Sequence, residues 1–208
     1  MRFNIWQVLL NRWYKKQLKK SEYDFLLAPP PANEWVSLDC ETTGLNREKD
    51  QIIAIGAIKI IGNQILTSEK LQLFIKPQGQ IHFNSIKIHH IRHKDLSSAI
   101  DPINAIDQLV RFIGSRPLVG YYLEFDVAMI NKLLIPMIGI PLPQQKIDVS
   151  GLFYDYKFKQ HTDSNVDLHF NYILKELEIP SWPNHDAIND ALMTALMFLK
   201  LRKLLKLK

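Results

Sequence analysis

The chain is poor in the residues that would place it in several common protein classes. It has one cysteine, Cys40, among 208 residues, which excludes an internal disulfide framework and a cysteine-based zinc site and favours a reducing compartment. No apolar run approaches the ~20 residues that a membrane-spanning helix needs. The apolar stretch Ile5 to Leu10 is shorter than the core of a signal peptide and runs straight into basic residues. We therefore expect a cytoplasmic protein.

Acidic residues are missing from both ends of the chain. Residues 1–20 carry six basic residues, the segment from Lys200 onward carries five, and all 21 acidic residues lie between Glu22 and Asp190. Basic ends around an acidic middle indicate contact with a polyanion, either nucleic acid or an anionic membrane surface. The alternative is that the basic ends are merely solvated, and the sequence leaves both open.

Composition divides the chain into an N-terminal appendage, residues 1–31, and a main domain, residues 32–208. Residues 1–20 place apolar side chains at helical spacing between basic ones, which predicts a basic amphipathic helix separate from the main core. The run Ala28 to Ala32 contains three consecutive prolines, which predict a stiff spacer. The helix has the residues to dock a partner protein, to attach to an anionic membrane surface or to pack on the protein's own core.

Strand and helix patterns through the main domain predict an α/β fold with a mixed five-stranded sheet flanked by helices. Gly62-Asn63 predicts a tight antiparallel turn between the second and third strands, and Asp101 is a candidate helix cap. The expected strands are 34–41, 51–61, 64–75, 117–122 and 145–149. The expected helices are 102–113, 125–134, 168–177 and 186–205. The buried stripe of the first helix is expected to be Ile103, Ile106, Leu109, Val110 and Ile113.

Two carboxylates end the first expected strand. Asp39 and Glu41 stand two positions apart, so their side chains point to the same face, about 7 Å apart along the chain, while Cys40 points to the other. Like charges held side by side repel, and a hard cation such as Mg²⁺ removes this repulsion because it takes carboxylate oxygens as ligands. A bare pair of this kind is more often two solvated acids, so it needs further support.

More candidate residues follow in the expected connections between strands and helices. Asp126 comes after the strand at 117–122, where such sheets gather functional groups, although a lone acid there is more often a helix-start residue. His185 and Asp190 lie at the start of the last helix, with Asp186 as a candidate cap. Five helical positions separate side chains by about 140°. Both can therefore face one site only if His185 comes from the loop before the helix.

The order of these residues resembles the DEDDh 3′–5′ exonuclease family, which includes the proofreading epsilon subunit of bacterial DNA polymerase III. The matching stretches are Ser-Leu-Asp-Cys-Glu-Thr-Thr-Gly-Leu at 37–45, Leu-Val-Gly-Tyr-Tyr-Leu-Glu-Phe-Asp at 118–126 and His-Asp-Ala-Ile-Asn-Asp-Ala at 185–191. A weaker match is Ile-His-His-Ile at 88–91, and the resemblance spans about 34–200. A related subgroup has tyrosine four residues before the last acid. Here that position holds Asp186, so the histidine subgroup fits.

The resemblance implies an RNase H-like sheet and a metal-dependent hydrolytic site. Two Mg²⁺ or Mn²⁺ ions can activate water and neutralise charge during phosphodiester hydrolysis, and His185 would take the proton from that water. Two ions also account for the convergence of several acids, whose mutual repulsion would otherwise raise their pKa values. The implied metal ligands are Asp39, Glu41, Asp126 and Asp190.

The resemblance also implies how the substrate binds. Thr42, Thr43 and Leu45 would line the pocket of the terminal nucleotide, with Leu45 against its base. His89 is a further candidate contact, with a solvated or hairpin-flanking role as the alternative. The implied partner is a nucleic acid with a free 3′ end, preferably single-stranded DNA.

The chain departs from the family at two places near these motifs. Many members have His-Asn where this chain has Tyr121-Tyr122, so Tyr122 becomes a candidate for stacking a base, with ordinary packing as the alternative for both rings. His90 stands where the family has glycine, which would reshape the entry to the cleft. Phe125 is expected in the core.

The sequence therefore predicts a 3′–5′ exonuclease that releases nucleoside monophosphates from DNA 3′ ends, as in proofreading or repair. An exoribonuclease is the nearest alternative, because nothing in these motifs reads the 2′-hydroxyl. A tethering or binding protein docked through residues 1–20 is an alternative of a different class. The complete set of acids argues against a purely non-catalytic role.

Overall fold

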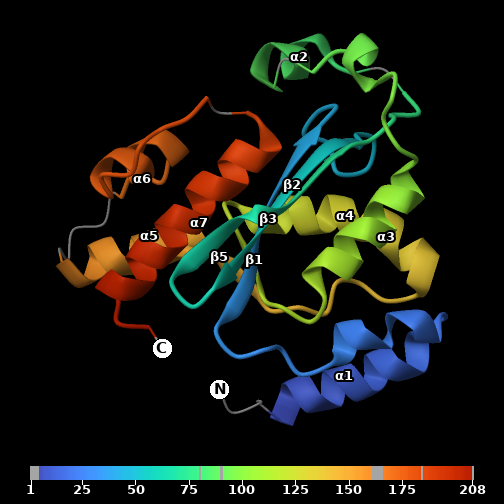
Figure 1. The fold of residues 1–208 in the computed structure, drawn as a ribbon, viewed down its shortest axis with the longest axis horizontal. Coiled ribbons are helices and arrows are strands. Elements are labelled where there is room, and N and C mark those ends of the chain that lie inside the picture. Colours follow the sequence, from blue (N-terminus) through green and yellow to red (C-terminus); the bar gives the residue numbers. More distant parts are fainter. Residues whose placement is uncertain (1–4, 80, 90, 161–165, 184, 208) are drawn as a thin grey trace.

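A five-stranded mixed sheet forms the centre of the computed structural model, which describes residues 5–79, 81–89, 91–160, 166–183 and 185–207 (Figure 1). The strands are β1 Glu34–Thr42, β2 Ile52–Ile61, β3 Gln64–Phe74, β4 Leu118–Gly120 and β5 Lys146–Asp148. They lie in the order β3-β2-β1-β4-β5. Strands β1, β2 and β3 pair antiparallel, while β4 is parallel to both β1 and β5. The predicted mixed sheet is confirmed.

Alternating side chains of β1 enter two different cores. Val36 belongs to a buried cluster on the face covered by α3 (Pro102–Ile113) and α4 (Leu123–Ile138). Trp35 belongs to a second cluster, on the face covered by α5 (Val149–Gln160), α6 (Phe170–Glu176) and α7 (Ala187–Leu204). Because Asp39 and Glu41 have the parity of Trp35 along the strand, β1 turns both carboxylates towards the α7 face.

The helices differ from the sequence prediction in several places. Helix α4 begins earlier than expected and continues to Ile138 with Pro136 inside it. Asp101 caps α3 as predicted, because its side chain accepts hydrogen bonds from two backbone N–H groups in the first turn of the helix. The predicted buried stripe is wrong at one position: Ile103 is 46% exposed, and Ala105 is buried instead. The sequence pattern does not predict α5 or the short elements α2 (Phe83–His89) and the 3₁₀ helix His93–Leu96. In α2 and the 3₁₀ helix, one or two turns offer too few residues for a helical period to show, and the 12 residues of α5 show no such period either.

The N-terminal segment packs on the main core. Helix α1 (Ile5–Gln17) is followed by a 3₁₀ helix, Ser21–Leu27, whose Tyr23 and Leu26 are buried in the same cluster as α3 and α4. The Lys19 N–H also donates to the Ile138 carbonyl oxygen at 2.9 Å. The expectation of a helix separate from the core therefore does not hold for this segment, while the domain division at residue 31 remains a prediction.

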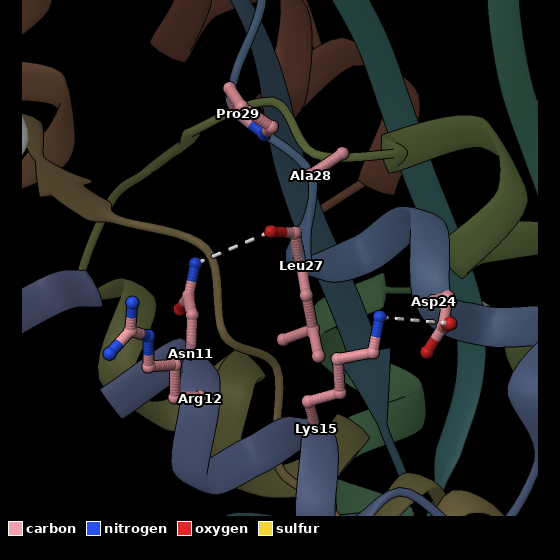
Figure 2. A pocket seen from close by; sticks show the side chains of 7 residues that line it. All are labelled: Asn11, Arg12, Lys15, Asp24, Leu27, Ala28 and Pro29. Atoms are coloured by element: carbon pink, nitrogen blue, oxygen red, sulfur yellow. Dashed lines mark hydrogen bonds and ion pairs between the residues drawn. The ribbon is translucent and has the colours of Figure 1, made fainter. Parts of the chain in front are cut away.

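One surface of α1 lines an open cavity of about 410 Å³ against residues 24–29 (Figure 2). Lys15 Nζ lies 3.5 Å from Asp24 Oδ2, and the Asn11 side-chain amide donates to the Leu27 carbonyl oxygen at 3.4 Å. Within the described ranges, no helix has the length and apolar character needed to cross a membrane.

Candidate active site

Strand β1 carries two of the five predicted catalytic residues. Asp39 pairs in register with Gly56 of β2. Ser37, two positions earlier, donates its hydroxyl to the Ala191 carbonyl oxygen of α7 at 2.7 Å. Since side chains two positions apart share a face of a strand, Asp39 and Glu41 lie on the face that α7 covers.

The start of α7 adds two more predicted residues. Asp186 caps the helix by accepting hydrogen bonds from two backbone N–H groups of its first turn. His185 precedes it in the left-handed region, with φ of 63°, and its backbone N–H donates to Asp190 Oδ2 at 3.0 Å. Glu41, His185 and Asp190 each offer one potential metal-ligand atom, a carboxylate oxygen or a ring nitrogen, and these three atoms lie within 4.8 Å of one another. His185 thus comes from the loop before the helix, as predicted.

A glycine of β2 allows α7 to approach the sheet this closely. A Cβ atom on Gly56 would lie 2.2 Å from the carbonyl carbon and oxygen of Ala187, the first residue of α7. Gly56 is also the register partner of Asp39, so the contact lies beside the carboxylates. An isolated glycine inside an apolar strand is the sequence signal for such an approach, and it identifies Gly56 as a residue that motif matching alone misses.

Asp126 occupies the first turn of α4 and is 5% exposed. The backbone N–H and the thiol of Cys40 donate to its carboxylate. Burial raises the pKa of Asp126, the Glu41 charge raises it further, and the Cys40 hydrogen bonds oppose the shift. Burial and the Asp126 charge in turn raise the pKa of the Cys40 thiol well above its usual range. Cys40 is therefore a neutral thiol that ties the end of β1 to the start of α4.

Asp39 lies within electrostatic reach of the other three acids. Burial raises the pKa of Asp39, and the charges of Asp126, Asp190 and Glu41 raise it further. Burial and then the Asp190 charge raise the pKa of Glu41 to about 7. Burial also raises the pKa of Asp190 to about 6, although the His185 N–H bond opposes the shift. The four acids form one cluster that is costly to ionise without a counter-charge.

This cluster fits a divalent metal ion. Hard cations take carboxylate oxygens as ligands, and their charge offsets the repulsion that raises these pKa values. Among the described residues, Asp190 Oδ1 is buried and has no hydrogen-bond partner, while the other oxygen of the same carboxylate is held by His185. A bound cation would satisfy that buried oxygen. The acids Asp39, Glu41, Asp126 and Asp190 are therefore suitable to hold the metal.

We expect the metal-free protein to lose stability as the pH rises from about 4 to about 7. Folding raises the pKa of Glu41 from 4.5 to about 7 and that of Asp190 from 3.8 to about 6. The folded state therefore binds more protons than the unfolded state in this window, so the favourable contribution is complete below it and lost above it. Thermal unfolding in EDTA should give a lower melting temperature at about pH 8 than at about pH 5. Added Mg²⁺ or Mn²⁺ should raise the melting temperature more at the higher pH than at the lower one. The absence of a metal effect at both pH values would contradict the metal assignment.

The loop after β1 is organised by Asp50, which the sequence prediction does not include. Its buried carboxylate accepts hydrogen bonds from the Thr43 hydroxyl and the Asn46 N–H, both at 2.8 Å. A Cβ atom on Gly44 would meet this carboxylate at 2.5 Å. The Thr43 hydroxyl also accepts from the Gln51 N–H at 3.0 Å. The Thr43 hydroxyl is therefore used within the loop, where it holds the loop's shape. The only sequence signal for Asp50 is that it is an acid directly before the expected strand at 51–61.

The other predicted substrate residues lie in different environments. The Thr42 hydroxyl donates to a backbone carbonyl two residues on, at 2.7 Å. Leu45 is 84% exposed and Tyr122 is 53% exposed. His89 is buried, and its Nδ1 accepts a hydrogen bond from the Ile91 N–H, so the solvated alternative for His89 is wrong. Contacts of these four residues and of Thr43 with a substrate stay predictions.

The two neighbouring tyrosines have separate environments. The Tyr121 ring packs edge-on against Phe170, with centroids 5.0 Å apart, and its hydroxyl donates to the Leu168 carbonyl oxygen. Tyr122 precedes α4 in the left-handed region, with φ of 49°, and its ring centroid lies 4.5 Å from that of Tyr121. Tyr121 is thus packed, whereas Tyr122 remains exposed. His90 lies outside the described residues.

Comparison with known sequences covers most of the chain. A family model described as Exonuclease (RNase_T) matches residues 36–198, which include all five predicted catalytic residues. A PolC-type DNA polymerase III from Thermotoga maritima is 27% identical over 173 residues, 83% of this chain and 12% of that protein. The same enzyme from Ureaplasma parvum is 35% identical over 115 residues, 55% of this chain and 8% of that protein. The chain thus spans only a small part of the length of these curated relatives.

Solved structures share the fold at low sequence identity. An exonuclease I structure superposes with a TM-score of 0.71 and 14% identity, covering 82% of this chain and 41% of that one. Cell-death related nuclease 4 gives a TM-score of 0.68 and 15% identity, covering 83% of this chain and 64% of that one. The likeness shows the RNase H-like exonuclease fold, and the family match over residues 36–198 shows that the chain belongs to this exonuclease family.

Proposed function

We propose that the protein is a metal-dependent 3′–5′ exonuclease that releases nucleoside monophosphates from DNA 3′ ends. The observation that carries the proposal is the cluster of acids beside His185: ligand atoms of Glu41, His185 and Asp190 lie within 4.8 Å of one another. The charges of Asp126, Asp190 and Glu41 raise the pKa of Asp39, which agrees with this arrangement. Isolated surface acids would not influence one another in this way. A role in polymerase proofreading or in repair is consistent with the PolC-type relatives.

The side chains of the cluster divide into two roles. The four acids would hold two ions, Mg²⁺ or Mn²⁺, which when bound activate water and neutralise charge on the phosphodiester oxygens. One ring nitrogen of His185 lies within 4.8 Å of a carboxylate oxygen of Glu41 and one of Asp190, and the His185 side chain is exposed. It would accept the proton from the attacking water, as imidazole does near neutral pH.

Single-stranded DNA is the proposed substrate. Escherichia coli exonuclease I, whose structure in complex with a dT13 oligonucleotide superposes with a TM-score of 0.70, shares the fold at 14% identity. The exposed Leu45 and Tyr122 would contact unpaired bases beside the acids. RNA ends are the alternative substrate, because no described group is assigned to a 2′-hydroxyl.

The proposal is tested by incubating matched DNA and RNA oligonucleotides with the protein. We expect a 5′-labelled DNA strand to shorten stepwise with Mg²⁺ or Mn²⁺ and to stay intact in EDTA. His185→Ala should slow the reaction about 100- to 10,000-fold, the usual contribution of general acid–base catalysis, while metal-induced stabilisation persists. Release of the 5′-terminal nucleotide first would refute the direction, and faster shortening of RNA would favour the exoribonuclease.

The proposal extends to a docking role for α1. Leu9, Leu10 and Trp13 are 49%, 40% and 55% exposed, and no acid lies within residues 1–20. This surface suits a partner protein or an anionic membrane surface. Deleting the segment would also remove the buried Tyr23 and Leu26, so Trp13→Ala is the cleaner variant. Sedimentation with anionic vesicles, with neutral vesicles as the control, tests the membrane partner. Unaltered binding of Trp13→Ala to the anionic vesicles would exclude this face from membrane attachment.

A further inference from the structure

Helix α2 presents an exposed aromatic ring next to a lysine. Phe83, its first residue, is 70% exposed. Lys87, one turn later, places Nζ 4.6 Å from the centroid of the Phe83 ring. Leaving a phenylalanine this exposed forgoes the free energy that its burial would provide. Lys87 is exposed as well, so the ring and the ammonium group are both accessible to a ligand.

Hydrogen bonds fix α2 to the loop that follows the catalytic strand. The Thr43 carbonyl oxygen accepts from the His82 N–H at 3.2 Å and from the Ser85 hydroxyl at 2.9 Å. His82 Nε2 lies 3.2 Å from Asp50 Oδ1, the carboxylate that also holds the Thr43 hydroxyl. Thr43 is two residues from Glu41, so these hydrogen bonds attach the start of α2 beside the end of the strand that carries Asp39 and Glu41. Figure 1 shows α2 near the carboxyl end of β1.

We propose that Phe83 and Lys87 form a binding site for an unpaired nucleotide upstream of the one that is removed. A base would stack on the exposed Phe83 ring, and the Lys87 ammonium would pair with the adjoining phosphate. Both interactions are independent of base identity, because every base has a π face and every linkage has a phosphate. The inference rests on the proposed exonuclease function, and it adds a second point of attachment for single strands.

Nucleic acid explains this pair better than an apolar partner would. An apolar protein surface would have to desolvate the Lys87 charge to reach the ring, which is costly without a counter-charge. A single strand offers the base and the negative charge together. A duplex keeps its bases stacked inside, so the site selects unpaired ends.

The test compares a substrate that has upstream nucleotides with one that has none, and the effect of each variant is expressed as a ratio between the two. One is a 5′-labelled oligothymidylate, and the other is the p-nitrophenyl ester of thymidine 5′-monophosphate, which has no upstream nucleotide. For Phe83→Ala we expect the ratio of kcat/KM on the oligonucleotide to that on the ester to fall about 5- to 150-fold, the loss of one base–aromatic stack. Phe83→Trp should keep the ratio, whereas Phe83→Leu should lower it because the side chain stays apolar without a ring.

The proposed phosphate contact of Lys87 is tested through the salt dependence of KM. For Lys87→Met we expect the dependence of log KM on log salt concentration to weaken by about 0.7, the value for one phosphate contact on a single strand. Phe158, 52% exposed on α5, provides the matched control, and Phe158→Ala should leave the ratio unchanged. An unchanged ratio in Phe83→Ala would overturn the inference. Failure of the unaltered protein to hydrolyse either substrate would instead overturn the proposed function.

Discussion

Replacing Asp39 by asparagine is expected to lower exonuclease activity at least about 100-fold, the scale seen when one electrostatic group of a catalytic site is lost. The same change should make the metal-free protein more stable at about pH 8. The gain in stability is expected because the charges of Asp126, Asp190 and Glu41 all raise the pKa of Asp39. Removing one of four mutually repelling charges lowers the electrostatic repulsion among the other three. Hydrolysis of a labelled oligonucleotide and thermal unfolding in EDTA measure the two effects.

The opposite signs of these effects separate a metal ligand from a structural residue. Replacing a residue that is needed only for folding would lower the activity and the stability of the protein together. Asp155, an exposed acid of α5, provides the control, because Asp155→Asn removes the same charge at a distance from the cluster and should change neither quantity. Full activity in Asp39→Asn would refute the metal site, and a less stable metal-free variant would refute the repulsion.

The site was predictable from the sequence where local spacing decides the geometry. Asp39 and Glu41 must share a face because a strand alternates its side chains. His185 had to come from a loop because five helical positions cannot bring it beside Asp190, and the structure begins α7 after it. The mixed sheet followed from the order of strand and helix patterns in the same way.

Features that depend on contacts between distant segments were not predictable in this way. The 3₁₀ helix that buries Tyr23 and Leu26 follows a basic helix whose composition suits a free appendage equally well. Asp50 looks like an ordinary turn residue until its hydrogen bonds to Thr43 and Asn46 are known. Helix α2 is too short to have a readable period, and its position is set by the Thr43 carbonyl oxygen.

Gly56 is the clearest case of this kind and leads to a second strong expectation. Gly56→Ala should destabilise the protein by about 1–3 kcal/mol, the usual cost of overpacking a closely packed site. The added Cβ would lie 2.2 Å from backbone atoms of Ala187, so the start of α7 must move away from β2. That movement carries His185 and Asp190 away from Asp39, and activity should fall even at temperatures where the variant is fully folded. Urea unfolding and oligonucleotide hydrolysis measure both.

A second glycine provides the matched control. Gly151 lies in α5, and a Cβ atom there would meet nothing within 4 Å, so Gly151→Ala should be neutral or stabilise the protein by about 0.5–1 kcal/mol. The rise in melting temperature on adding Mg²⁺ distinguishes a positioning role from simple loss of stability. It should shrink in Gly56→Ala, because the ligands on β1 and α7 no longer meet, and should persist in Gly151→Ala. A Gly56→Ala protein that is destabilised but keeps its full metal response would show that Gly56 supports packing alone.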